Sequence, residues 1–177
     1  MFVWVAVDTE KQLCKIKENA LYACRDLCLE KYVPNLPFHV SLKISFFIED
    51  EKAEEVISFL KNYFSKQNAF EITPIGFKCE NGIIWIEMLK SPTLCKLHEE
   101  LDDLLLKTFN VLPHEFDLQF KFHTTLFYGA PTDKLQTAID KLLNVKLPNK
   151  IWVDTFIIGT SKTGEAGTYG ILDTIKV

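Results

Sequence analysis

Two stretches decide how this chain folds: Leu36-Pro37-Phe38-His39-Val40-Ser41-Leu42-Lys43-Ile44 and Phe120-Lys121-Phe122-His123-Thr124-Thr125-Leu126-Phe127. Both are rich in aromatic and aliphatic residues that favour strands, and both place a histidine two positions before a hydroxyl residue. Apolar residues occupy most of the intervening positions. Each stretch therefore predicts a strand with one buried apolar face and one polar face.

The polar face of each predicted strand carries the same kind of side chains. Because strand side chains alternate between faces, His39, Ser41 and Lys43 are expected on one face of the first strand. The corresponding face of the second strand is expected to carry Lys121, His123 and Thr125. The sequence thus predicts two strands that each present a histidine, a hydroxyl group and a lysine.

The remaining chain alternates helical and strand-like segments. Asn81-Gly82 predicts a tight hairpin, because both residues tolerate positive φ, and Ser91-Pro92 predicts a helix start. Helices are expected over 11–29, 50–66, 91–109 and 132–143, and strands over 2–8, 38–48, 70–79, 83–89, 119–128, 150–160 and 168–177. The order helix, strand, helix, strand, strand then occurs twice.

That repeated order predicts the fold class. We expect one α+β domain over residues 1–177, with repeat halves at roughly 9–89 and 91–177. The fold would be bilobal and duplicated, with pseudo-twofold symmetry and an antiparallel sheet flanked by helices in each lobe. Both histidine motifs fall at the same element of the repeat.

Composition excludes several classes of protein. Of the 177 residues 47% are hydrophobic, which excludes a disordered chain. The net charge is -4 and Arg25 is the only arginine, so a protein that coats long nucleic acid is not expected. The five cysteines show no metal-ligand spacing and are expected to be reduced thiols. No apolar stretch reaches membrane-spanning length, so we expect a cytoplasmic protein. We also expect a monomer that needs no cofactor.

The two histidines suit proton transfer near neutral pH. One imidazole can accept a proton while the other donates one, as cleavage of a phosphodiester requires. Ser41 and Thr125 would donate hydrogen bonds to the phosphate oxygens, and Lys43 and Lys121 would add positive charge. Which histidine is the acid and which the base stays open.

The other histidines are expected to have no catalytic role. His98 lies in Leu97-His98-Glu99-Glu100, which lacks the second histidine of a metalloprotease signature, and we expect it on a solvated helix face. His114 has no evident partner. A zinc site built on His39 and His123 would lack a third ligand, so no metal is expected.

Paired His-x-Ser/Thr strands in a duplicated α+β chain resemble the 2H phosphoesterase superfamily, and especially its 2'-5' RNA ligase and cyclic phosphodiesterase branch. Residues 36–43 look like the first signature of that branch, and Gly167-Thr168-Tyr169-Gly170-Ile171-Leu172 is similar to its closing strand. The resemblance covers essentially the whole chain. Ser41 stands where threonine is commoner in the family.

The resemblance implies an activity and a site. His39, Ser41, His123 and Thr125 would be catalytic, in a cleft between the lobes, with Tyr169 and Phe127 as candidates for base stacking. The expected activity is metal-independent hydrolysis of 2',3'-cyclic or 2'-5' phosphodiester bonds in small nucleotides or RNA ends. Alternatives are RNA 2'-5' ligation, action on ADP-ribose cyclic phosphate or cyclic oligonucleotides, and a nucleotide-binding module without catalysis.

Overall fold

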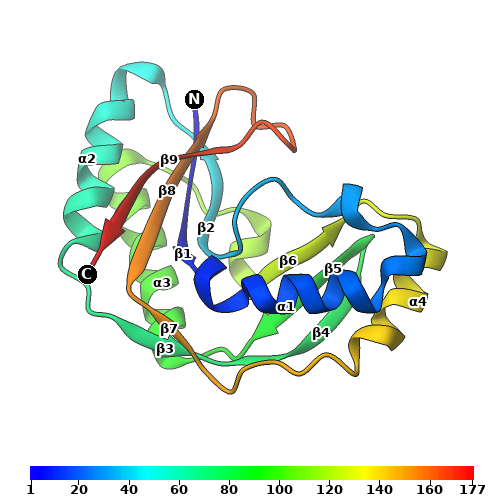
Figure 1. Cartoon of the computed structure of the whole chain (residues 1–177). Helices are drawn as coiled ribbons and strands as arrows, with labels where there is room; N and C mark the ends of the chain where they lie inside the picture. Colours follow the sequence, from blue (N-terminus) through cyan, green and yellow to red (C-terminus); the bar gives the residue numbers. More distant parts are fainter.

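The computed structural model describes residues 1–177 and contains four α-helices and nine strands (Figure 1). The helices are α1 (Glu10–Ala23), α2 (Ala53–Phe64), α3 (Pro92–Phe109) and α4 (Thr132–Leu142). The strands are β1 (Phe2–Asp8), β2 (His39–Phe47), β3 (Phe70–Ile72), β4 (Pro74–Glu80), β5 (Ile83–Met88), β6 (His123–Tyr128), β7 (Ile151–Val153), β8 (Thr155–Ser161) and β9 (Gly170–Lys176). Short 3-10 turns lie at Arg25–Leu27, Glu30–Tyr32, Asp50–Lys52 and Glu115–Gln119.

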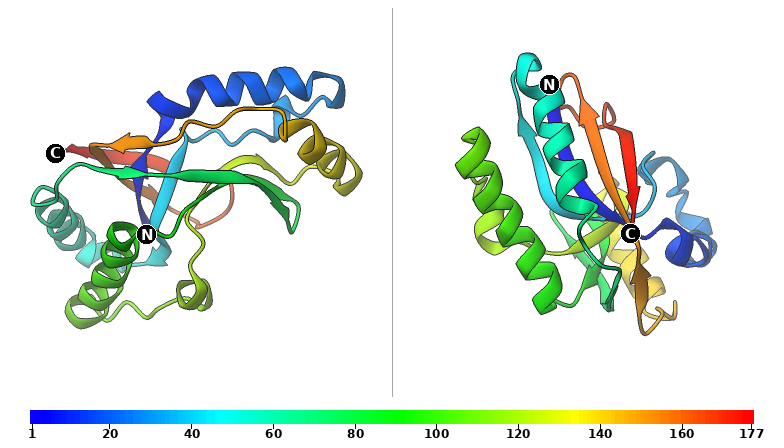
Figure 2. Two further views of the ribbon diagram at one scale, coloured as in Figure 1. Left: turned by 90° about the horizontal axis from the view of Figure 1, so that it is seen from below. Right: turned by 90° about the vertical axis from the view of Figure 1, so that its left-hand side faces the viewer.

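The strands form three antiparallel sheets, in the orders β2-β1-β8-β9, β4-β5-β6 and β3-β7. Helix α3 packs against β2 and α2 against β8, whereas α4 packs against β4 and β5 and also contacts α1. Figure 2 shows α2 and α3 at one end of the molecule and α1 and α4 at the other. Each of the two larger sheets is therefore covered by its own helices.

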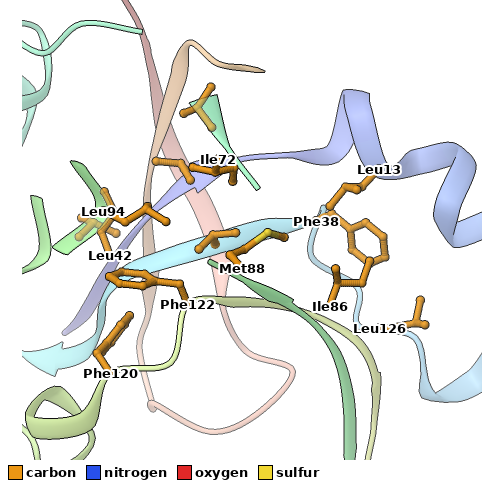
Figure 3. Packing of buried hydrophobic residues seen from close by; sticks show 14 of the residues in the cluster. Leu13, Phe38, Leu42, Ile72, Ile86, Met88, Leu94, Phe120, Phe122 and Leu126 are labelled. Carbon is orange, nitrogen blue, oxygen red and sulfur yellow. The ribbon is translucent and has the colours of Figure 1, made fainter. Parts of the chain in front are cut away.

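A single cluster of 37 buried apolar residues connects these layers. Figure 3 shows part of it, where Leu13 of α1, Leu42 of β2, Ile86 of β5 and Leu94 of α3 project into the same interior. Burial of apolar side chains along one face of each element is the main favourable contribution to folding. The α+β class with antiparallel sheets and flanking helices is thus confirmed.

The sheets combine strands from distant parts of the sequence. The order β2-β1-β8 in one sheet corresponds to β6-β5-β4 in the other, and β3 pairs with β7 between them. This correspondence favours a repeat that begins with β1 and β5, one strand earlier than the halves 9–89 and 91–177. The twofold symmetry itself stays a prediction.

Several element boundaries differ from those expected. The Asn81-Gly82 hairpin has positive φ at both residues, and the Ser91 side chain accepts a hydrogen bond from the Leu94 N–H at the start of α3, as predicted. The helix expected over 11–29 ends at Ala23, before the left-handed Cys28. The strand expected over 119–128 starts only at His123, because Glu115–Gln119 forms a 3-10 turn.

The five cysteines are free thiols. No helix combines the length and the apolar character needed to cross a bilayer.

Candidate active site

His39 and His123 are the first residues of β2 and β6, and these two strands lie against each other although they belong to different sheets. The two histidines are close enough for a charge on His123 to lower the pKa of His39. The two motifs that are far apart in the sequence therefore meet in the fold.

Both imidazoles are held in the same way. Nδ1 of His39 lies 2.8 Å from the Pro37 carbonyl oxygen, and Nδ1 of His123 lies 2.7 Å from the Lys121 carbonyl oxygen. Since a carbonyl oxygen only accepts, Nδ1 carries the proton and donates it in each ring. The neutral form of each histidine therefore leaves Nε2 unprotonated and free to react.

A tryptophan packs against each of these rings. The ring centroids of Trp4 and His39 are 4.8 Å apart, and those of Trp85 and His123 are 5.3 Å apart. Both tryptophans are buried on strands that neighbour the motif strands, so they fix the rings from the side. Neither Trp4 nor Trp85 could be predicted as part of the site, because a tryptophan in a strand gives no functional signal by itself.

The environment lowers the pKa of both histidines. Burial is the largest cause for His39, and the Pro37 carbonyl and the Asp8 carboxylate oppose it. Burial is also the largest cause for His123, where the Lys121 charge lowers the pKa further and the Lys121 carbonyl and Glu87 raise it. Both imidazoles are therefore mostly neutral at pH 7, since the ordinary histidine pKa is about 6.5.

A β-bulge follows the hydroxyl residue in each motif strand. In β2, Ser41 pairs with Ala6 and Lys43 pairs with Val5, so Leu42 is the additional residue. In β6, Thr125 pairs with Trp85 and Phe127 pairs with Ile84 across the same kind of shift. A bulge interrupts the alternation of side chains. His and hydroxyl therefore share a face as predicted, but the residues after the bulge do not follow the simple alternation.

The expected position of Lys43 beside Ser41 is wrong for this reason. Lys43 is 1% exposed, and its ammonium group lies between two carboxylates, 2.7 Å from Asp102 Oδ1 and in an ion pair with Asp117. Both partners lie behind β2, in α3 and in the Glu115–Gln119 turn. Lys43 is thus buried on the core side of the strand, where its ammonium group cannot contact a phosphate beside Ser41.

The expected stacking role of Phe127 is wrong for the same reason. Phe127 is fully buried in the hydrophobic core, whereas the next residue, Tyr128, is 53% exposed. Strict alternation from His123 would instead place Tyr128 on the buried face. The bulge exchanges the two positions.

A cavity of about 510 Å³ opens beside His39 and Thr125. The loop Lys31–Pro37 forms one wall, and Tyr128 and Tyr169 contribute aromatic rings to the lining. The Tyr169 hydroxyl lies 2.7 Å from Ser45 Oγ and 2.9 Å from the Gly164 carbonyl oxygen. Tyr169 therefore lies at the cavity as expected, and the two contacts of its hydroxyl group hold the ring in place.

Lys121 lies at the surface, two residues before His123. It forms an ion pair with Glu80 at 2.7 Å, and its ammonium group lies 5.9 Å from the centroid of the Trp85 ring. A second hollow of about 670 Å³, between α2 and the end of α3, is lined by Glu51, Glu54 and Glu55. Its acidic lining disfavours a phosphate, so the cavity beside His39 is the better candidate.

Two further histidines differ from expectation. His98 is 6% exposed and not on a solvated helix face, because its ring stacks on Phe120 and its Nδ1 donates a hydrogen bond to the Leu42 carbonyl oxygen. His114, for which no partner was evident, accepts a hydrogen bond from the Phe116 N–H at the start of the Glu115–Gln119 turn.

His98, Asp102 and Asp117 place ligand atoms within 4.8 Å of one another, as in a metal site. The Lys43 ammonium group already lies between the two carboxylates and supplies their positive charge.

Solved structures with the same fold include that of LigT from E. coli complexed with 3'-AMP, with 18% identity and a TM-score of 0.65 over 99% of this chain and 97% of that chain. TT0787 of Thermus thermophilus has 14% identity and a TM-score of 0.64, covering 99% of this chain and 97% of that one. Usb1 of Kluyveromyces marxianus has 12% identity and a TM-score of 0.52 over 99% and 98% of the two chains.

A comparison with curated protein sequences finds no match. The family model described as the 2'-5' RNA ligase superfamily matches residues 14–165, a range that contains both histidine motifs and the bulges that follow them. The match spans most of the chain. The similarity of the fold to that of LigT over the full length of the chain agrees with it. The chain therefore belongs to the 2'-5' RNA ligase superfamily.

Proposed function

We propose that the protein is a phosphodiesterase that opens 2',3'-cyclic or 2'-5' phosphodiester bonds of small ribonucleotides or RNA ends without needing a metal. The observation that carries the proposal is the pair of imidazoles on β2 and β6, each held through Nδ1 so that Nε2 is free. Two such nitrogen atoms on adjacent strands can act on opposite sides of one phosphorus atom.

The reaction needs one neutral and one protonated imidazole. The neutral Nε2 removes a proton from water, and the water oxygen forms a bond to phosphorus. The bond between phosphorus and a ribose oxygen breaks, and that oxygen receives the proton from Nε2 of the second histidine. A cyclic phosphate thus becomes a phosphomonoester with a free neighbouring hydroxyl, and the two histidines have exchanged protonation states.

Hydroxyl groups and a single lysine are assigned to the phosphate. Ser41 and Thr125 share their strand faces with the histidines and would donate hydrogen bonds to the non-bridging oxygens. Lys121 would contribute positive charge, since its charge already acts on His123. Hydrogen bonds aimed at the charge that develops in the transition state are among the strongest sources of catalysis.

The cavity beside His39 is assigned to the nucleoside. The rings of Tyr128 and Tyr169 suit an unpaired base, because aromatic side chains stack on bases with little sequence preference. The LigT structure with 3'-AMP supports a nucleotide ligand in this fold. With Lys31 the only lysine or arginine in the lining, a small nucleotide or a single RNA end fits better than a long polyanion.

Ligation is a second candidate, favoured by the description of the family that matches the chain. Joining a ribose hydroxyl to a cyclic phosphate uses the same two proton transfers, with the hydroxyl in place of water. The same site would therefore serve both, and the availability of a second RNA end would decide which is observed.

An assay with 2',3'-cyclic nucleotides and 2'-5' oligoadenylates in the presence of a chelator tests the proposal. His39→Ala and His123→Ala should each lower kcat by roughly 100- to 10,000-fold, the usual contribution of a general acid or base. His114→Ala is the matched control, because His114 is exposed and caps the Glu115–Gln119 turn instead. Binding without turnover would leave only a nucleotide-binding module, and full activity of either motif variant would refute the assigned roles.

A further inference from the structure

A buried charged cluster lies directly behind the motif residues of β2. Lys43 follows the bulge, and its ammonium group pairs with Asp102 of α3 and Asp117 of the Glu115–Gln119 turn. Asp117 also accepts a hydrogen bond from the backbone N–H of His114. The cluster thus ties β2 to α3 and to the segment that leads into β6.

His98 of α3 completes the cluster and contacts the bulge itself. Its Nδ1 lies 2.8 Å from the carbonyl oxygen of Leu42, the additional residue of the bulge. Because that oxygen only accepts, Nδ1 carries the proton and donates it. The residue before Leu42 is Ser41, so this hydrogen bond fixes the backbone next to the motif hydroxyl.

The same imidazole contacts the approach to the second motif. The ring stacks on Phe120 with centroids 4.1 Å apart, and Phe122 packs against it edge-on at 6.1 Å. Nε2 lies 3.3 Å from the carbonyl oxygen of Asp117, which also only accepts, so this contact is a hydrogen bond only when Nε2 carries a proton as well. Figure 3 shows Leu42, Phe120 and Phe122 in the same part of the core. Phe122 immediately precedes His123, so one side chain supports both motif strands from behind.

The chemistry of the cluster favours positioning over stability. Three charged groups and an imidazole occupy a place in the core where apolar side chains of similar volume are often as stabilising or more so. Such groups specify one arrangement, because each must keep its partner. Here the arrangement fixes the backbone of the bulge in β2 at Leu42. Bulges beside active sites commonly orient a neighbouring side chain, which here is that of Ser41.

We propose that His98, together with Lys43, Asp102 and Asp117, positions the two motif strands relative to each other, an inference that rests on the proposed function. None of the four lines the cavity beside His39. They act through the backbone of Leu42 and through the Phe120–Phe122 segment, and so hold the Ser41 hydroxyl and the His123 ring in register.

The test compares two substitutions at one position. His98→Phe keeps an aromatic ring on Phe120 but removes both ring nitrogens, and should lower kcat for a 2',3'-cyclic nucleotide roughly 10- to 100-fold, as a misplacement of about 1 Å does. Binding of a nucleoside without a phosphate should change little, because the cluster contributes no residue to the lining of the nucleoside cavity. His98→Asn offers an amide N–H near the place of Nδ1 and should recover much of kcat.

Ser91→Ala is the matched control for a merely structural effect. It removes the N-terminal cap of the same helix and destabilises α3 without touching the cluster. All variants are compared at a temperature at which each is fully folded by circular dichroism. Ser91→Ala should then keep the wild-type kcat, whereas His98→Phe should not.

A second readout does not depend on turnover. The imidazole proton and nitrogen NMR signals of His39 and His123 should move in His98→Phe and return towards wild type in His98→Asn. Unchanged signals and an unchanged kcat in a folded His98→Phe would overturn the proposal. If the wild type shows no turnover, the proposed function fails, and the NMR shifts alone decide whether the cluster positions the motifs.

The charged part of the cluster provides an independent variant in case His98→Phe does not fold. Lys43→Met combined with Asp102→Asn and Asp117→Asn removes all three charges without leaving one unpaired. This variant should keep the fold, lower kcat and shift the same two histidine signals. A folded triple variant with wild-type kcat and wild-type signals would overturn the proposal equally.

Discussion

Substituting alanine for Gly159 tests how the first motif histidine is held. Gly159 of β8 pairs with Trp4 of β1, and a Cβ atom at Gly159 would lie 2.1 Å from Trp4 Cε2 and 2.2 Å from Nε1. Ordinary contacts begin near 3.4 Å, so the indole would have to move by more than 1 Å. The absence of a side chain at Gly159 is therefore what allows Trp4 to lie across the sheet.

The indole has little freedom to make that movement. Trp4 is 4% exposed and forms a buried cluster with Ala6 and Ile157, against which Tyr169 packs, and its ring also contacts the His39 ring. Overpacking of a filled site usually costs about 1–3 kcal/mol of unfolding free energy. For a chain of this size, each kcal/mol lowers Tm by about 2–4 °C. A displacement of His39 of about 1 Å would also lower kcat, by up to roughly 100-fold.

Gly76→Ala is the matched control, since nothing lies within 4 Å of the Cβ position there and Gly76 is also in a strand. Urea unfolding of both variants and of the wild type measures the difference in unfolding free energy. Gly76→Ala should be neutral or slightly stabilising, by about 0.4–1 kcal/mol. Equal stability and equal activity of the two variants would refute the contact between Trp4 and His39 as the support of that ring.

Three further predictions follow from the same geometry. Burial lowers the pKa of His39 and His123, so the unfolded chain binds more protons than the folded chain below about pH 6.5. The unfolding free energy should therefore fall as the pH is lowered below that value. Replacing both histidines by Gln should flatten this pH dependence, as measured by urea unfolding at several pH values. The bell-shaped profile of kcat/KM should have its optimum below pH 6.5, because both pKa values lie on that side; an optimum above pH 7 would contradict the shifts. Phe127→Ala should lower the unfolding free energy by about 3–5 kcal/mol, because Phe127 is fully buried. Tyr128→Ala should leave Tm nearly unchanged but weaken nucleotide binding measured by calorimetry. If Phe127→Ala instead weakened nucleotide binding and left Tm unchanged, Phe127 would be the stacking residue.

The parts of the site that depend on local patterns could be predicted from the sequence. Alternation correctly placed His39 with Ser41 and His123 with Thr125, because each pair lies before the bulge. The same rule misplaced Lys43, because a single additional residue exchanges the two faces. No residue type in either stretch marks the bulge: Leu42 is an ordinary strand residue, and no glycine is present.

The contacts that decided the remaining misplacements are distant in the sequence. The sequence predicts His98 on a solvated helix face, but β2 and the turn before β6 bury it. The partners of Lys43 likewise lie 59 and 74 positions further along the chain, at Asp102 and Asp117. Such pairings require the tertiary arrangement, which periodicity within one element cannot supply.

The burial of Lys43 also changes the meaning of the acidic net charge. Without that lysine, Lys121 is the cation whose charge acts on His123, and it is shared with Glu80. Binding of a phosphate must then come mainly from hydrogen bonds of Ser41, Thr125 and whichever imidazole is protonated. Such donors recognise one phosphate at close range and contribute little to the long-range attraction that a polyanion needs. The site is therefore suited to a single phosphodiester presented by a small molecule or a chain end, whatever nucleoside occupies the cavity.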